Sequence, residues 1–221
     1  MTMVLGIAGS SFGQGYAIFG TSGKSWVWDN FSTAGTSQVG GTASANIDIA
    51  FLIGSTANTP LLGTVGNPSG NTTSFNMSQG TTIWNDILND PNFSLAQNLG
   101  TSSLAITPVN TSALVRGGWS YLGGASFQVA NHAGGTYSIV AIAWDAAYST
   151  PQLAAAADAA VGWSSVFSYA LQPDTSTAPG TFNGAGMTPF GVTSIATVPE
   201  PTALALAGLG GLSLLLGRRK K

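Results

Sequence analysis

The chain contains no cysteine and very few charged residues. Without cysteine it forms neither disulfide bonds nor thiolate-ligated metal sites. Lys, Arg, Asp and Glu together make up 6% of the 221 residues, far below the roughly 25% of an ordinary soluble domain. The composition therefore excludes a disulfide-stapled fold and a cysteine-ligated zinc domain.

The few charges are unevenly distributed along the chain. Four of the six basic residues are the last four residues, which leaves only Lys24 and Arg116 in the rest of the chain. Seven of the eight acidic residues are Asp, and the single Glu is Glu200. The body is mildly acidic and lacks the basic surface that nucleic acid requires, so we expect no nucleic-acid partner.

Short apolar segments separated by Gly, Ser, Thr and Asn indicate a mainly β domain over residues 14–197. Tyr16–Phe19 and Ser25–Trp28 flank Gly-Thr-Ser-Gly, which predicts a hairpin. Ala45–Ile53 is the clearest strand of the first half, because every second residue is apolar. Thr82–Asn89 is typical of a short helix that begins at Thr82 and stops before Pro91.

The most regular pattern lies between Ala125 and Leu171. Ala125, Phe127 and Val129 alternate with polar residues, and Asn131–Gly135 is predicted to be a turn. Tyr137–Trp144 is apolar on both faces, which indicates a central strand between two layers. The chain then offers an Ala-rich helix from Thr150 that begins with Pro151 and ends at Gly162, a strand over Trp163–Ala170 and a last strand over Pro189–Thr197. We expect a β-sandwich with one or two short helices and a C-terminal apolar helix. An immunoglobulin-like strand order is the more specific form of this prediction.

Residues 1–13 are typical of the second half of a secretion signal. A short apolar stretch is followed by small residues, and Ser11 and Gly13 would occupy positions −3 and −1 of a cleavage site before Gln14. The usual basic beginning is missing, so we expect the signal to be truncated, with the true start codon further upstream.

The last two dozen residues combine a proline-rich junction, an apolar run and a basic end. Residues 202–217 carry no charge and contain seven leucines. As a helix they would span about 24 Å, against roughly 30 Å for a bilayer core, and flanking basic side chains extend that reach. Because the basic cluster lies at one end only, the positive-inside rule places the C-terminus in the cytoplasm and the body outside. A buried helix of the domain is the alternative, which the terminal basic cluster disfavours. The cluster, which we expect to act as a membrane stop, consists of Arg218, Arg219, Lys220 and Lys221.

Pro199-Glu200-Pro201, the apolar run and the arginine-containing end, in this order, resemble the PEP-CTERM sorting signal of bacterial exosortase substrates. The resemblance covers residues 198–221, about a tenth of the chain. It implies export across the inner membrane and cleavage near Pro-Glu-Pro by exosortase, a membrane-embedded cysteine transpeptidase, in bacteria that make biofilm or exopolysaccharide. It also implies that Pro199, Glu200 and Pro201 are the recognition motif. The protein would be tethered to the inner membrane in transit and end at the cell surface or in the extracellular matrix.

The body offers a second resemblance. Ala143-Trp144-Asp145, an Ala-rich insert and the Gly-x-Ser-Ser-x-Phe segment of residues 162–167 are similar to Verrucomicrobia-type PEP-CTERM proteins of unknown function. This resemblance implies no activity.

Motifs for catalysis or nucleotide binding are weak. Gly20–Ser25 lacks the first glycine of a phosphate-binding loop, where Ile18 stands, and a strand rather than a helix is expected next. Gly9–Gly13 fits Gly-x-Ser-x-Gly but falls in the presumed signal. The single histidine, His132, lies in a predicted turn, where a surface role is more probable than that of a general base.

Carboxylates and tryptophans leave two alternatives open. Asp86 and Asp90 would suit a glycosidase pair or, with neighbouring Asn residues, a Ca²⁺ site, although their spacing matches no EF-hand and polar residues at a helix end explain them more simply. Six tryptophans would bind sugar if exposed, but in a sandwich they more often pack in the core. They are Trp26, Trp28, Trp84, Trp119, Trp144 and Trp163. We therefore expect an exported protein without catalytic residues, cofactor or metal. A carbohydrate-binding module for exopolysaccharide is the first alternative and a secreted hydrolase the second.

Overall fold

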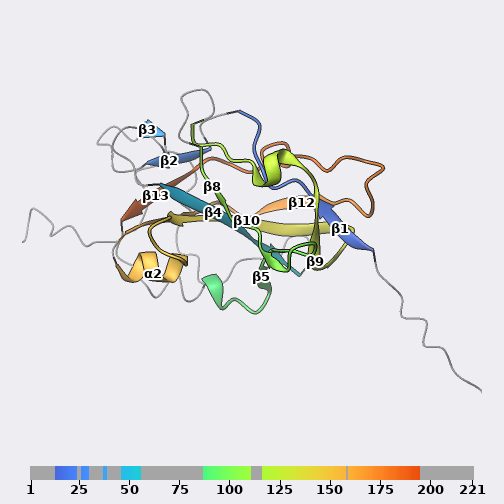
Figure 1. The fold of residues 1–221 in the computed structure, drawn as a ribbon, viewed down its shortest axis with the longest axis horizontal. Helices are drawn as coiled ribbons and strands as arrows, with labels where there is room; N and C mark the ends of the chain where they lie inside the picture. The colour runs from blue at the N-terminus through green and yellow to red at the C-terminus, as the bar shows by residue number, and fades with distance from the viewer. Residues whose placement is uncertain are drawn as a thin grey trace, which may run out of the picture.

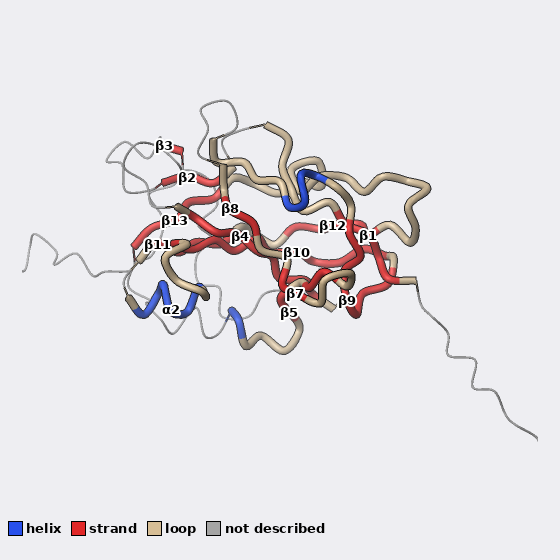
Figure 2. The backbone as a smooth tube through the Cα atoms, in the orientation of Figure 1, coloured by secondary structure: helices blue, strands red, loops and turns tan. Residues whose placement is uncertain are grey.

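The computed structural model describes residues 13–23, 26–29, 37–38, 46–55, 87–110, 116–157 and 159–194, and the structural statements below concern these residues. They form two β-sheets with little helix, as Figures 1 and 2 show. The mainly β prediction is confirmed.

The larger sheet is centred on β10 (Gly135–Asp145), which is antiparallel to its direct neighbours. These neighbours are β4 (Ile47–Gly54) on one side and, on the other, β11 (Ala160–Trp163) and β12 (Phe167–Leu171). The strand order is β3-β2-β13-β11-β10-β4-β5, and β8 also pairs with β4. The remaining bounds are β2 (Val27–Asp29), β3 (Ser37–Gln38), β5 (Phe93–Leu95), β8 (Thr107–Pro108) and β13 (Phe190–Ser194).

The smaller sheet has the order β1-β9-β6-β7, and it joins the larger one on two sides. Only Ala96 separates β5 from β6, and its N–H donates to the carbonyl of Phe51 on β4 at 3.0 Å. On the other side, Tyr16 and Gln172 exchange two backbone hydrogen bonds of 2.8 and 3.0 Å. The strands thus close a ring around the core. The bounds are β1 (Gln14–Ala17), β6 (Gln97–Asn98), β7 (Ser103–Leu104) and β9 (Phe127–Ala133), and a 3₁₀ turn, η2, covers Tyr121–Gly124.

Strand β10 is buried on both faces, as its apolar pattern predicts. Ile139, Ala141 and Ala143 face the core between the sheets. The alternate residues face a second apolar layer that includes α2 (Pro151–Ala156) and the helical residue Ile87. Figure 1 shows α2 on one side of the larger sheet. The alternate residues are Val140, Ile142 and Trp144.

Aromatic rings fill the space between the sheets. Phe182 lies at the centre, with its ring centroid 5.1 Å from Phe51, 5.3 Å from Phe19 and 5.0 Å from Tyr169. Rings at these separations attract each other beyond their burial of apolar area.

Other local predictions are confirmed with shorter bounds. In β4, Ile47, Ile49, Phe51 and Ile53 face the aromatic core, as the alternation predicts. Helix α2 begins after Thr150, whose hydroxyl accepts a hydrogen bond from the Leu153 N–H at 3.3 Å. The last strand, β13, starts at Phe190, one residue after the predicted start.

Three local predictions are wrong. The two N-terminal strands do not form a hairpin, because β1 pairs with β9 while β2 runs parallel to β13. Residues 131–133 continue β9 instead of turning, although Asn131 has a φ of 62°. Gly162 does not end the helix but lies inside β11, and the predicted strand over residues 163–170 is two strands, β11 and β12.

Two elements of the prediction lie beyond what the structure decides. The two sheets enclose a core as in a sandwich, but an immunoglobulin-like strand order is not confirmed. The apolar helix expected at residues 202–217 and the signal expected before Gly13 lie outside the described residues. None of the helices in the described ranges is long and apolar enough to cross a membrane.

Candidate functional site

The last described strand, β13, is held inside the larger sheet. It is antiparallel to β11, with Ser194 opposite Ala160, and parallel to β2, with Val192 opposite Asp29. The side chains of Phe190 and Val192 are 0% and 2% exposed. The chain therefore reaches its C-terminal segment from a strand with partners on both sides, and not from a loose end.

A glycine lets β11 and β13 approach each other. A Cβ atom on Gly162 would lie 2.0 Å from the carbonyl oxygen of Gly191 on β13. No side chain fits at that distance, so the pairing of these strands requires glycine at position 162.

The end of the sheet where β13 stops also carries two carboxylates. On β11, Ala160 pairs with Ser194 of β13, and the next residue, Val161, pairs with Trp144 of β10. Trp144 also pairs with Asp48 of β4, so Asp48 lies at the same end of the sheet as Ser194. The Asp48 side chain is partly buried, which raises its pKa. Asp145 follows Trp144, and its carboxylate accepts the Ala147 N–H at 2.9 Å. No group of three His, Cys, Asp or Glu side chains within the described residues is placed to hold a metal ion.

The predicted sorting residues follow this sheet end closely in sequence. Pro199 lies five residues after Ser194, and the basic cluster ends the chain. Pro199, Glu200, Pro201 and the four basic residues 218–221 lie outside the described residues. The structure thus places the strand from which the motif extends, whereas the motif's own role rests on its sequence.

His132 takes part in strand structure. Its ring nitrogen Nδ1 lies 2.9 Å from the Ala130 carbonyl oxygen, and its ring packs edge-on against Tyr137 with centroids 5.2 Å apart. Its backbone N–H donates to the Gln14 side chain at 3.2 Å. These contacts join β9 to β10 and β1, and they include no nucleophile. The predicted surface turn is replaced by a half-buried position in a strand.

Asp90 also has a structural contact. Its side chain is 4% exposed, and its carboxylate accepts the Asn92 N–H at 2.8 Å in the turn before β5. Asp86, its predicted partner in a carboxylate pair or Ca²⁺ site, lies outside the described residues. The hydrogen bond explains Asp90 as a turn residue.

Three of the six tryptophans lie in the core. Trp119, Trp144 and Trp163 are 1%, 2% and 5% exposed, so their rings offer no surface on which a sugar would stack. Trp26 is half-buried, and its indole N–H donates to the Ser22 carbonyl at 3.1 Å. Trp84 and the side chain of Trp28 lie outside the described part of the chain.

Sequence reasoning missed two residues that organise the body. Phe182 is fully buried although it stands in the Pro/Gly/Ser/Thr-rich segment 172–186, where it is the single aromatic residue. The Tyr169 hydroxyl accepts the Ile18 N–H at 3.0 Å and donates to the Gly180 carbonyl at 2.6 Å, while burial raises its pKa to about 12. The presence of a single aromatic residue in a polar segment was the sequence signal that could have predicted the burial of Phe182.

Residues 197–221 match the PEP-CTERM protein-sorting motif, a match that begins three residues after β13 ends. Neither the curated proteins nor the solved structures gave a match to the chain. The resemblance of the body to Verrucomicrobia-type proteins therefore stays a prediction. The sorting motif supports a PEP-CTERM protein whose export to the cell envelope or surface depends on sorting by exosortase.

Proposed function

We propose that the protein is a non-enzymatic component of the cell surface or extracellular matrix, sorted and cleaved at its C-terminal tail. The observation that carries this proposal is the match of residues 197–221 to the sorting motif, directly after a strand that completes the domain. A folded body followed by a removable tail is the organisation that sorting by cleavage requires.

The tail suits each step of this proposal. Residues 202–217 would insert as a short membrane helix, and Arg218 and Arg219 would hold its cytoplasmic end. Pro199 and Pro201 restrict the backbone to an extended form with few hydrogen bonds, which suits a peptidase cleft. The segment before Gln14 would serve as the export signal.

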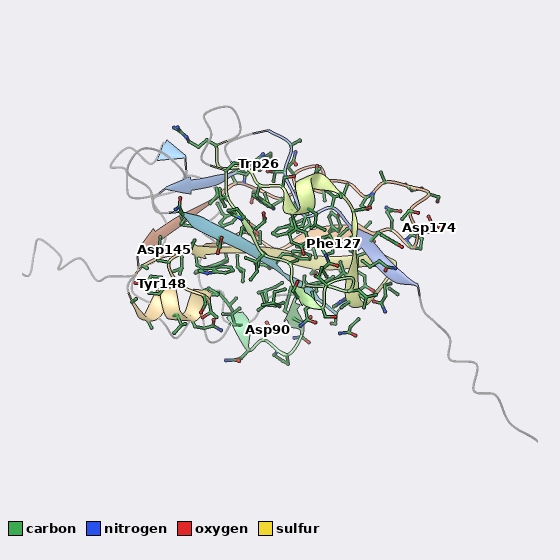
Figure 3. The ribbon with its side chains drawn as sticks, in the orientation of Figure 1. Trp26, Asp90, Phe127, Asp145, Tyr148 and Asp174 are labelled. Carbon is green, nitrogen blue, oxygen red and sulfur yellow. The ribbon has the colours of Figure 1, made fainter. Side chains whose placement is uncertain are left out.

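The placement of three carboxylates among the described residues supports the proposal of a role without catalysis. Figure 3 places Asp90, Asp145 and Asp174 on different sides of the domain, so these carboxylates form no common site. His132 and Asp90 have structural contacts. A secreted hydrolase would need such groups to converge around a substrate.

Mutation of the motif tests the proposal directly. Full-length Pro199→Ala and Glu200→Ala variants, produced in an exosortase-containing bacterium, should accumulate with the tail attached, and Pro173→Ala, at an exposed proline outside the motif, should be processed normally. Mass spectrometry of the C-terminus separates the two forms. Normal processing of both motif variants would refute recognition through Pro-Glu-Pro.

Binding of exopolysaccharide is the alternative molecular role. The burial of three tryptophans removes three stacking surfaces, which leaves Trp26 as the half-buried tryptophan of the described residues. A glycan array with the processed protein tests this alternative. Binding that disappears in Trp26→Ala would favour it over a purely structural role.

A further inference from the structure

The distance between the folded domain and the sorting motif is short. Four residues separate Ser194 from Pro199. At roughly 3.3–3.6 Å per residue, the five steps from Ser194 to Pro199 span at most about 18 Å when fully extended. A protein cleft that holds Pro199 must therefore lie close to the end of β13.

The connection could be lengthened only by releasing β13 from the sheet, which would cost folding free energy. Releasing β13 would break its pairing with both β11 and β2. It would also expose Phe190 and Val192, which are 0% and 2% exposed in the folded domain. The connection is thus fixed where the strand ends, as long as the domain is folded.

The two ends of the described chain also lie far apart. Figure 1 shows β13 at one end of the long axis and β1 at the other. Figure 3 shows Asp145 and Tyr148 toward the β13 end and Asp174 toward the β1 end. A short connection at β13 therefore determines which end of the body faces the membrane.

We propose that exosortase engages the sheet end formed by β13, β11 and β10 while it processes the tail, because only four residues connect Pro199 to the end of a strand held inside the sheet. This inference rests on the proposed function and adds to it a surface and an orientation. The β13 end faces the enzyme and the membrane, and the β1 end, with the β9–β10 connection, points away.

Changes in the length of the connection between Ser194 and Pro199 test whether processing requires the enzyme to lie close to the end of β13. Deletion of residues 195–197 shortens the extended span to about 7 Å, and we expect processing to slow at least tenfold. Replacement of the same three residues by Gly-Ser-Gly keeps the length and should leave the rate unchanged. Pulse-labelling with detection of the processed form gives the rates, and resistance of the body to protease confirms folding in both variants.

Cross-linking tests the orientation and does not depend on the deletion variant. Because the chain has no cysteine, one introduced cysteine carries one photo-reactive group. Ala147→Cys lies in the exposed turn after β10, and Ser176→Cys is equally exposed near Asp174. With the full-length protein in exosortase-containing membranes, we expect a cross-link to exosortase from position 147 and none from position 176.

The outcomes separate this inference from the proposed function. Normal processing of the deletion variant, slow processing of the Gly-Ser-Gly variant, or cross-links from position 176 alone would overturn the short connection and its orientation. If Pro199→Ala is still blocked in those same cells, the proposed function stands. If Pro199→Ala and Glu200→Ala are both processed normally in those cells, the proposed function itself fails.

Discussion

At the scale of single residues, Gly162 sets the spacing between β11 and β13. Any side chain there would meet the Gly191 carbonyl, which has no room to move because β13 is paired on both sides. We expect Gly162→Ala to lower the free energy of unfolding by at least about 2 kcal/mol, as for other overpacked sites.

Urea unfolding followed by circular dichroism measures this change. Gly180→Ala is the matched control, because a Cβ at position 180 would meet nothing within 4 Å. If both variants had the same midpoint, the close approach of the two strands would not constrain the sheet.

Two aspartates should affect stability with opposite pH dependence. Burial raises the pKa of Asp48, so ionisation of this carboxyl in the folded state costs free energy, and that cost appears as pH rises through its unfolded and folded pKa values. Asp48→Asn should therefore raise the melting temperature by about 1–2 °C at pH 7 and have no such effect below about pH 3.

Asp174 is the comparison for Asp48. Hydrogen bonds from the Ser176 hydroxyl and N–H lower its pKa, so its contribution is present above the unfolded pKa and is lost as pH falls through the folded one. Asp174→Asn should lower the melting temperature slightly at neutral pH. Melting curves from pH 3 to pH 7 check both signs, and parallel curves for the two variants would contradict the assignment.

At the scale of elements, β13 decides whether the larger sheet is complete. A chain that ends after Ser194 keeps all the described strands and should unfold like the full body. A chain that ends after Thr188 loses β13, and with it the parallel partner of β2 and two buried side chains. We expect the shorter chain to lose cooperative unfolding and to bind a hydrophobic dye. Equal melting curves for the two chains would show that β13 is dispensable.

Local pattern predicts elements better than it predicts their partners. Strand β4, strand β10 and helix α2 follow from alternation, burial on both faces and a Thr-Pro helix start, all of which are local signals. The pairing of β2 with β13 joins residues about 160 positions apart, and no local signal marks it. Gly162 was wrongly predicted to end a helix for the same reason. Its role is to let Gly191 approach, and Gly191 lies on a strand almost 30 residues later.

At the scale of the whole molecule, the two apolar layers share β10. Ile139 and Ala141 face the aromatic core, and the alternate residues Val140 and Ile142 face the layer under α2. We expect one cooperative unfolding transition, in which tryptophan fluorescence and far-ultraviolet circular dichroism give the same midpoint. Two separate midpoints would mean that the layer under α2 unfolds on its own.

The sorting site and the body differ in how far sequence identifies them. The tail is recognisable because a proline motif, an apolar run and a basic end occur in a fixed order, which requires no knowledge of the fold. In the body, His132 and Asp90 suggested chemistry by residue type alone, and the structure gives them contacts in a strand and a turn. Residue type does not show whether side chains converge, because convergence depends on how distant strands pair.

The position of β13 also links folding to the order of secretion. In a chain exported from its N-terminus, β2 emerges early and waits for a partner that emerges only when residues 190–194 have crossed the membrane. The sorting motif begins three residues after β13, so it reaches the membrane directly behind this strand. In such a chain the sheet would be completed as the tail arrives at the membrane, so we expect the fold to be complete when a sorting enzyme first meets its motif.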